Sequence, residues 1–230
     1  MECWTGFPGQ NIIQYPMIRN FIFTLCILVQ YSLSAQSKMV FENYNYLGQP
    51  GSGSVVPMMH FETKNNWYAE LRYNYEEVNT LSFFGGKTFS PGGEKRYGLT
   101  PLAGFSVGDF TGVSAGLNID AEWDKTFLAS QSQYSMATKQ GADNFFFNWS
   151  ELGCDLSNNF FGGLAVQLTL QHDNNSTEPG FFAGLNFSNI SIPVYVFSPF
   201  TKDRYFVIGI YYEYTMKGKK RHSGLKVNTY

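Results

Sequence analysis

Few side chains in this sequence could act as a nucleophile, a base or a metal ligand. Hydrolysis by a serine nucleophile needs a histidine base beside the serine and an acid that orients the histidine. His60, with Ser54 or Ser82 and Glu70, is the one set that strand pairing could bring together. Nothing marks either serine as a nucleophile. The alternative, an inert histidine inside the fold, is therefore favoured, and we do not expect an enzyme.

Metal, phosphate and nucleic-acid chemistry receive no support either. The spacing of glutamate and histidine suggests no metal site. The glycine-rich stretch 83–86 is not followed by a helical pattern, so it is not a phosphate-binding loop. The net charge of -2 offers no basic footprint for nucleic acid. We predict no metal and no cofactor.

Charged and amide side chains fall instead at alternate positions of apolar segments. In the stretch 112–123 every second residue is apolar, and Asn118, Asp120 and Glu122 are among the residues between them. Strict alternation predicts a β-strand with one apolar and one polar face.

The same pattern, punctuated by turn signals, recurs along the chain. It predicts twelve strands, with ten as the fallback: 39–47, 54–63, 67–76, 79–88, 95–107, 111–123, 126–138, 143–156, 160–172, 179–187, 190–199 and 204–216. Many are longer than the usual ~5–6 residues of soluble strands. They match the ~9–11 residues that cross a bilayer at a tilt.

Two architectures could use such strands. A soluble secreted β-barrel binding protein would turn the apolar faces inward, whereas a membrane barrel turns them toward lipid. The polar faces carry few lysines, and Trp67, Tyr73, Tyr75 and Trp123 end apolar faces as aromatic girdles do. We therefore predict an all-β, antiparallel up-and-down transmembrane β-barrel. Its outward residues should include Trp67, Leu71, Leu117, Ile119, Leu164, Val166, Leu185 and Val194.

The flanking segments predict export. Residues 17–35 combine Arg19, a short apolar run and small residues near Ala35, as in a cleaved signal peptide. Residues 1–16 are then an upstream extension or a long n-region, and 36–216 form the barrel. The basic tail 217–230 is either solvated or rests on anionic headgroups. Cleavage would leave Cys154 alone, so no internal disulfide is expected.

The sequence resembles Gram-negative outer-membrane β-barrel proteins in three features: the signal peptide, the alternating strands and the aromatic last strand with Tyr212 and Tyr214. The resemblance implies an outer-membrane location with both termini periplasmic. It also implies two partners, outer-membrane lipid and the barrel-insertion machinery. In such proteins this machinery recognises the aromatic end of the last strand. The chain departs from the pattern because it continues past Tyr214 to Tyr230.

In that architecture the polar faces line a lumen. The candidate lining residues are His60, Glu62, Glu70, Arg72, Arg96, Asn118, Asp120, Glu122, Gln131, Gln133, Glu151, Gln167, Gln171, Asn186 and Glu213. Turn lengths set His60 opposite Glu70, and Arg96 opposite Glu122. The periplasmic end of the lumen should be charged, and the part further out rich in glutamine and asparagine.

Three functions remain open for such a barrel. The lumen could be a narrow channel that steers small polar solutes, or it could be a closed structural barrel with a charged interior. The protein could also be an envelope scaffold or binding partner. Short loops argue against a large constriction loop folded into the lumen. The longest connections, 48–54 and 172–178, are expected to face outward.

Overall fold

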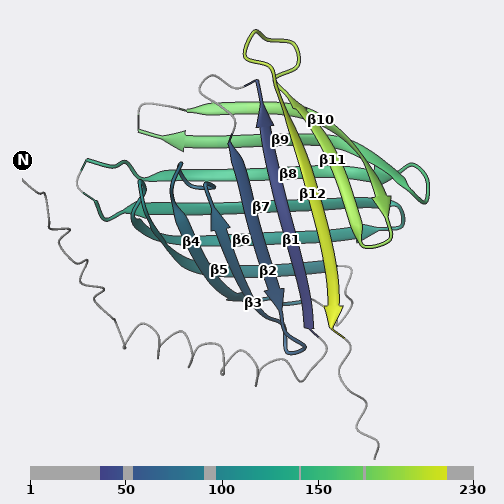
Figure 1. Cartoon of the computed structure of the whole chain (residues 1–230), viewed down its shortest axis with the longest axis horizontal. Helices are drawn as coiled ribbons and strands as arrows, with labels where there is room; N and C mark the ends of the chain where they lie inside the picture. Colours follow the sequence, from purple (N-terminus) through teal and green to yellow (C-terminus); the bar gives the residue numbers. More distant parts are fainter. Residues whose placement is uncertain (1–36, 49–53, 91–96, 140, 173–174, 217–230) are drawn as a thin grey trace, which may run out of the picture. The chain divides into compact units, whose positions relative to one another are not determined.

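Twelve β-strands close into one barrel (Figure 1). The computed structural model describes residues 37–48, 54–90, 97–139, 141–172 and 175–216. The strands are β1 (Ser37–Leu47), β2 (Val55–Glu62), β3 (Trp67–Tyr73), β4 (Leu81–Lys87), β5 (Tyr97–Val107), β6 (Gly112–Trp123), β7 (Thr126–Ala137), β8 (Phe145–Asp155), β9 (Phe160–Gln171), β10 (Ser176–Phe187), β11 (Ile190–Phe197) and β12 (Tyr205–Met216). The predicted fold class and strand number are confirmed.

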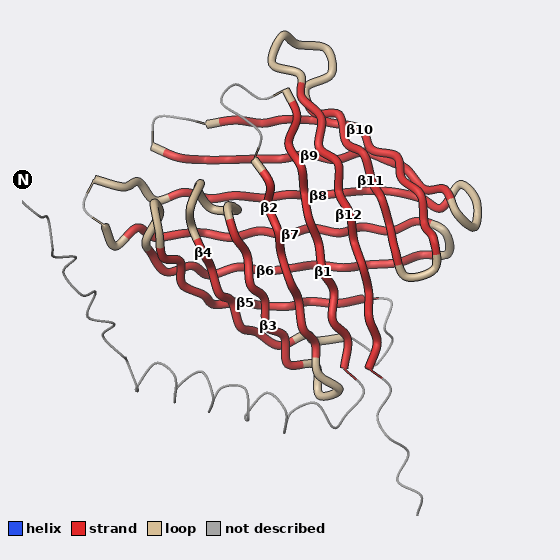
Figure 2. Tube along the Cα trace, viewed as in Figure 1, coloured by secondary structure: helices blue, strands red, loops and turns tan. Residues whose placement is uncertain are grey.

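Each strand pairs antiparallel with its neighbours in sequence, and β1 closes the barrel against β12. In Figures 1 and 2, β1, β2 and β12 run steeply across the view, whereas β6 to β9 run nearly horizontally behind them. Opposite walls of the barrel therefore cross at a large angle. β1 begins and β12 ends at the same rim, beside the short β2–β3, β6–β7 and β10–β11 turns. In bacterial barrels this is the periplasmic rim.

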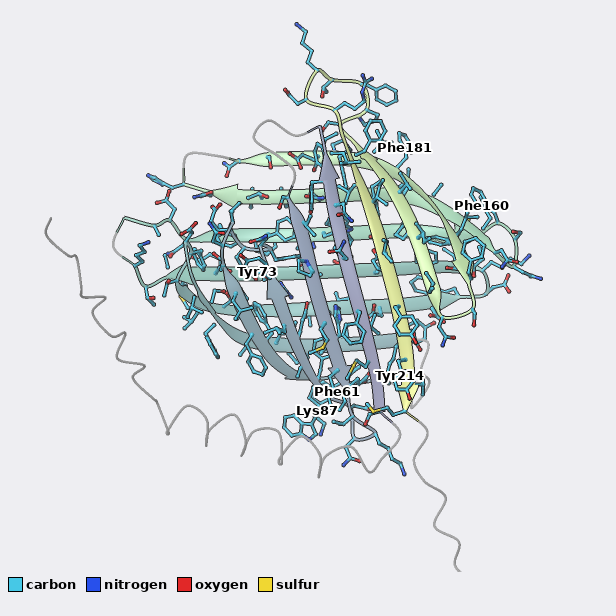
Figure 3. All side chains as sticks on the ribbon, in the orientation of Figure 1. Phe61, Tyr73, Lys87, Phe160, Phe181 and Tyr214 are labelled. Carbon is cyan, nitrogen blue, oxygen red and sulfur yellow. The ribbon has the colours of Figure 1, made fainter. Side chains whose placement is uncertain are left out.

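The apolar faces point outward, as predicted. Trp67 is 60% exposed, and Leu71, Leu117, Leu164, Leu185 and Val194 are exposed too, while Ile119 and Val166 are partly exposed. The exposed aromatic residues labelled in Figure 3 include Tyr73, which ends β3, Phe160, which begins β9, and Tyr214, near the end of β12. Exposed aromatic side chains thus occur at both rims, where membrane barrels carry their aromatic girdles.

Two predicted strand boundaries are wrong by three residues, and the others differ from the observed ones by two residues or fewer. β3 ends at Tyr73 rather than at residue 76, because Asn74 and Asn79 adopt positive φ angles of 60° and 53° that break the extended chain. Conversely, β10 begins at Ser176, where pairing with Thr169 extends the ladder outward. The segment 172–178 is therefore not one of the long connections.

Several predictions fall outside the described residues. They concern the extension 1–16, the signal peptide 17–35, the tail 217–230 and Arg96. No helix in the described part of the chain is long and apolar enough to cross a membrane.

Candidate functional site

A buried ion network on β3 reaches across the lumen. Arg72 is 1% exposed, and its Nε donates to Glu70 Oε1 at 2.7 Å. Its other guanidinium nitrogen donates across the barrel to Gln133 Oε1 on β7 at 2.5 Å. The guanidinium also lies 4.3 Å from the ring centre of Phe84. Hence three contacts fix one buried cation between opposite walls.

The β3–β4 connection folds into the lumen and completes this network. The Glu76 side chain is fully buried, lies 3.4 Å from Arg72, and accepts hydrogen bonds from Ser82 and Gln133. Tyr75 donates to Gln131 at 2.7 Å and packs edge-on against Phe147. Burial raises the pKa of the Tyr75 phenol, so this group stays a neutral donor.

One expectation is thereby corrected. Tyr75 was predicted on the outward apolar face, but the chain reverses at Asn74 and carries its side chain inward. The β3–β4 connection is short, as expected, but it carries the side chains of Tyr75 and Glu76 into the lumen, which was not predicted from the sequence. Asn74 and Asn79 hold the connection through Asn79 N–H to Asn74 Oδ1 at 2.8 Å and Asn74 N–H to the Thr80 carbonyl at 2.9 Å.

A second group of interior side chains is aromatic and links β1, β8, β11 and β12. The phenol of Tyr211 donates to Tyr44 at 2.9 Å, and the phenol of Tyr195 donates to Glu151 at 2.9 Å. Trp149 donates to the same Glu151 oxygen at 2.6 Å and packs on Tyr44 and Tyr195. Because Tyr44 and Trp149 lie on non-adjacent strands, this contact also crosses the lumen.

We call these two groups together the septum. It comprises Glu70, Arg72, Tyr75, Glu76, Gln133, Tyr44, Trp149, Glu151, Tyr195 and Tyr211. A further aromatic cluster of Phe161, Phe182, Phe197 and Tyr205 packs against Trp149 and Tyr195. Direct side-chain contacts therefore span the middle of the lumen.

The periplasmic side of the septum is charged and open to solvent. Lys38 and Glu213 form an exposed ion pair at 2.9 Å, and Asp120 and Glu122 are exposed. Glu62 shares their rim, at the end of β2. Water therefore reaches the interior from this end.

Between that rim and the septum lies His60. The predicted register between His60 and Glu70 is confirmed, although Nε2 and Oε1 are 3.9 Å apart. The closer contacts are Tyr68 Oη to His60 Nδ1 at 2.6 Å, and His60 Nε2 to Glu42 Oε1 at 3.4 Å without hydrogen-bond geometry.

The other predicted lining residues are spread along the inward face. Asn118 lies in mid-β6 opposite Gln131, and its Oδ1 is buried without a hydrogen bond in the described part of the chain. Asn186 accepts a hydrogen bond from Ser191 at 2.6 Å near the periplasmic end of β10. The predicted opposition of Arg96 and Glu122 stays a prediction, because Arg96 is not among the described residues.

The opposite, outer end of the lumen holds a cavity of about 430 Å³, which we call the vestibule. Glutamines 133, 167 and 171 line it, as do the aromatic residues Tyr46, Tyr75, Phe110, Phe145 and Phe147 and the acids Glu76, Glu77, Asp109 and Asp143. Because Gln133, Tyr75 and Glu76 belong to the septum and also line this cavity, the septum is the floor of the vestibule. The periplasmic end is charged and glutamines line the outer end, as predicted, but the outer end also carries four acids that the prediction did not place there.

The serine–histidine arrangement is not formed among the described residues. Ser82 hydrogen-bonds Glu76 and Ser106 instead of His60. No cluster of histidine, cysteine and acidic side chains that could hold a metal ion occurs in that part of the chain.

Sequence reasoning missed Tyr44, Tyr75, Glu76, Tyr195 and Tyr211 as interior site residues. Alternation along their strands places tyrosines 44, 195 and 211 on inward faces, but as aromatic residues they were not counted among the polar lining. The signal for Tyr75 and Glu76 was the pair of flanking asparagines, residue types that tolerate positive φ.

Comparison with known proteins gives fold-level matches. No protein-family model and no curated protein matches the sequence. The structure is similar to the NanC porin, with a TM-score of 0.53 and 10% sequence identity, covering 76% of this chain and 98% of that chain. It is also similar to the KdgM porin (TM-score 0.51, 8% identity, 76% and 98% covered) and to the KdgM porin in complex with disordered oligogalacturonate (0.52, 9%, 76% and 98%). The protein therefore has the fold of outer-membrane porins, in line with the predicted architecture.

Proposed function

We propose that this protein is a narrow solute channel of the Gram-negative outer membrane, closed in the present conformation by its septum. The observation that carries the proposal is the composition of the septum. Rotatable, hydrogen-bonded side chains such as Arg72, Gln133 and Tyr75 separate a vestibule from a solvated periplasmic mouth.

A purely structural barrel does not need this polar network for its stability. Buried ion pairs give weak net stabilisation, since the desolvation of the charges offsets their attraction. An apolar filling of the same volume would hold the walls together at least as well. A polar septum instead provides a path along which a small polar solute can exchange hydrogen bonds with the wall.

The likeness to two porins supports the channel proposal at the level of fold. The exposed apolar wall, with aromatic residues at both rims, supports placement in a bilayer. Outer-membrane lipid and the barrel-insertion machinery are the partners that this placement requires. Mass spectrometry of the protein purified from outer membranes tests export, since the mature chain should lack residues up to about Ala35.

Conductance in planar bilayers tests the channel directly. We expect small, infrequent openings from the wild type. In Gln133→Ala we expect several-fold larger conductance, because the amide that accepts the Arg72 hydrogen bond across the lumen is removed. Ser132→Ala is the matched control, since Ser132 points to the opposite face of β7, and should match the wild type. If wild type and Gln133→Ala both conduct no more than lipid alone, the protein is a closed structural barrel.

A further inference from the structure

The vestibule combines negative charge with aromatic surface. Four carboxylates line it, and no lysine, arginine or histidine is among its described lining residues. The bases of the same rim, Lys139, His172, Lys202 and Arg204, lie outside the lining. Asp109 and Asp143 are exposed, so they act on an incoming solute through water as well as by contact.

One vestibule side chain has an unused hydrogen-bond donor. Gln167 is 6% exposed, and its Nε2 makes no hydrogen bond of normal geometry with the described residues. Tyr46 is the polar group near this amide, but the pair lacks the distance and angle of a hydrogen bond. A buried amide without an acceptor costs about 1–3 kcal/mol. A ligand oxygen in the vestibule would remove that cost.

We propose that the vestibule binds a small hydroxylated amine, of the chemical class of amino sugars and amino alcohols. The inference rests on the proposed function in that it names the solute class the channel takes. A hydroxyl oxygen of the solute accepts from Gln167 Nε2, and its ammonium group faces Asp109, Asp143 and Glu77.

Size and surroundings fit this class. The volume of about 430 Å³ lies within the range of small-ligand pockets, about 300–1,000 Å³. The phenol of Tyr75 and the ring of Phe147, which meet edge-on at 5.5 Å, present apolar faces to the C–H side of a ring or chain. An ammonium group near such aromatic rings gains a further attraction. Anionic solutes, by contrast, meet the carboxylates of Glu77, Asp109 and Asp143, and no base is among the described lining residues.

Three sugars that share a ring but differ in charge test the proposal. Isothermal titration of the purified barrel in detergent with glucosamine, glucose and glucuronate should give affinity in that order, with glucuronate at least ten-fold weaker than glucosamine. Gln167→Leu should weaken glucosamine and glucose alike, by about ten-fold. Asp143→Asn, at an exposed position that does not threaten folding, should weaken glucosamine a few-fold and leave glucose unchanged.

Two variants serve as controls. Asp203→Asn removes a carboxylate from the same rim but outside the vestibule, and Asn118→Leu removes an interior amide from another part of the lumen. Both should bind glucosamine like the wild type. Equal or tighter binding of glucuronate, no binding of any of the three sugars, or wild-type affinity in a folded Gln167→Leu variant would overturn the proposal. Binding without conductance would overturn the channel and leave this site standing, whereas conductance without binding would do the reverse.

Discussion

Replacing Arg72 by methionine should destabilise the barrel more than any other single loss of charge in the described chain. The guanidinium is 1% exposed, and its partner Glu70 is 1% exposed. Methionine keeps the apolar stem of the side chain but removes the guanidinium group, with its charge and its contacts to Gln133 and Phe84. The variant leaves the carboxylates of Glu70 and Glu76 buried without their cation.

The expected magnitude follows from that burial. Breaking a buried ion pair by removing one partner costs about 3–5 kcal/mol, because a charge is left without compensation. An exposed pair such as Lys38–Glu213 is worth about 0–1 kcal/mol. The two cases therefore differ by an amount that unfolding measurements resolve.

Urea unfolding of the barrel from lipid vesicles, followed by tryptophan fluorescence, measures the difference. Arg72→Met should lower the free energy of unfolding by about 3–5 kcal/mol. The control Lys125→Met, in an exposed turn, should change it by less than about 0.5 kcal/mol. In the double variant Arg72→Met/Glu70→Gln, the loss should be smaller than in the single variant, because one uncompensated carboxylate is gone. A loss below about 1 kcal/mol for Arg72→Met would mean that water screens the network, and the septum would not be closed.

Three further outcomes follow from the fold. In single-tryptophan variants, lipids with brominated chains should quench the fluorescence of Trp67, which is 60% exposed on the outer wall, and spare that of Trp149, which is 7% exposed inside. Equal quenching would contradict the placement of Trp67 outside and Trp149 inside the barrel. Tyr195→Phe should cost about 1–3 kcal/mol in urea unfolding, because Glu151 loses a buried donor; a neutral result would place water there. Gly163→Val should prevent formation of the heat-modifiable folded band on gels, because a Cβ at this position would lie 2.1 Å from the Leu152 carbonyl oxygen.

Strand alternation and turn length were sufficient to predict the barrel. The three-residue turn after Thr63 fixed the pairing of His60 with Glu70, and the two-residue turn at Asp124–Lys125 fixed the parity of β7. These are local relations, because each turn determines the register of the two strands that it joins. The same relations predicted that Trp67 and Leu164 face outward.

Contacts across the lumen follow a different rule, and the sequence could not predict them. Arg72 and Gln133 are 61 positions apart, and no turn between them sets their separation. Their contact depends on how far apart opposite walls lie, which is a property of the whole closed sheet. The inward fold at Tyr75 likewise depends on an acceptor, Gln131, on a strand that does not neighbour β3.

The difference between strand pairing in the wall and side-chain contacts across the lumen determines how the septum opens. The ladder hydrogen bonds fix β3 and β7 in the wall, so neither strand has to move for the Arg72–Gln133 contact to break. Only side-chain torsions and the connection between Asn74 and Thr80 must change, and that connection is tied to the strands by a few hydrogen bonds at its ends. A septum built this way opens by local rearrangement of Tyr75 and Glu76 while the barrel stays intact. A disulfide or other tether between this connection and β7 should therefore hold conductance at the closed level without changing the heat-modifiability of the folded barrel.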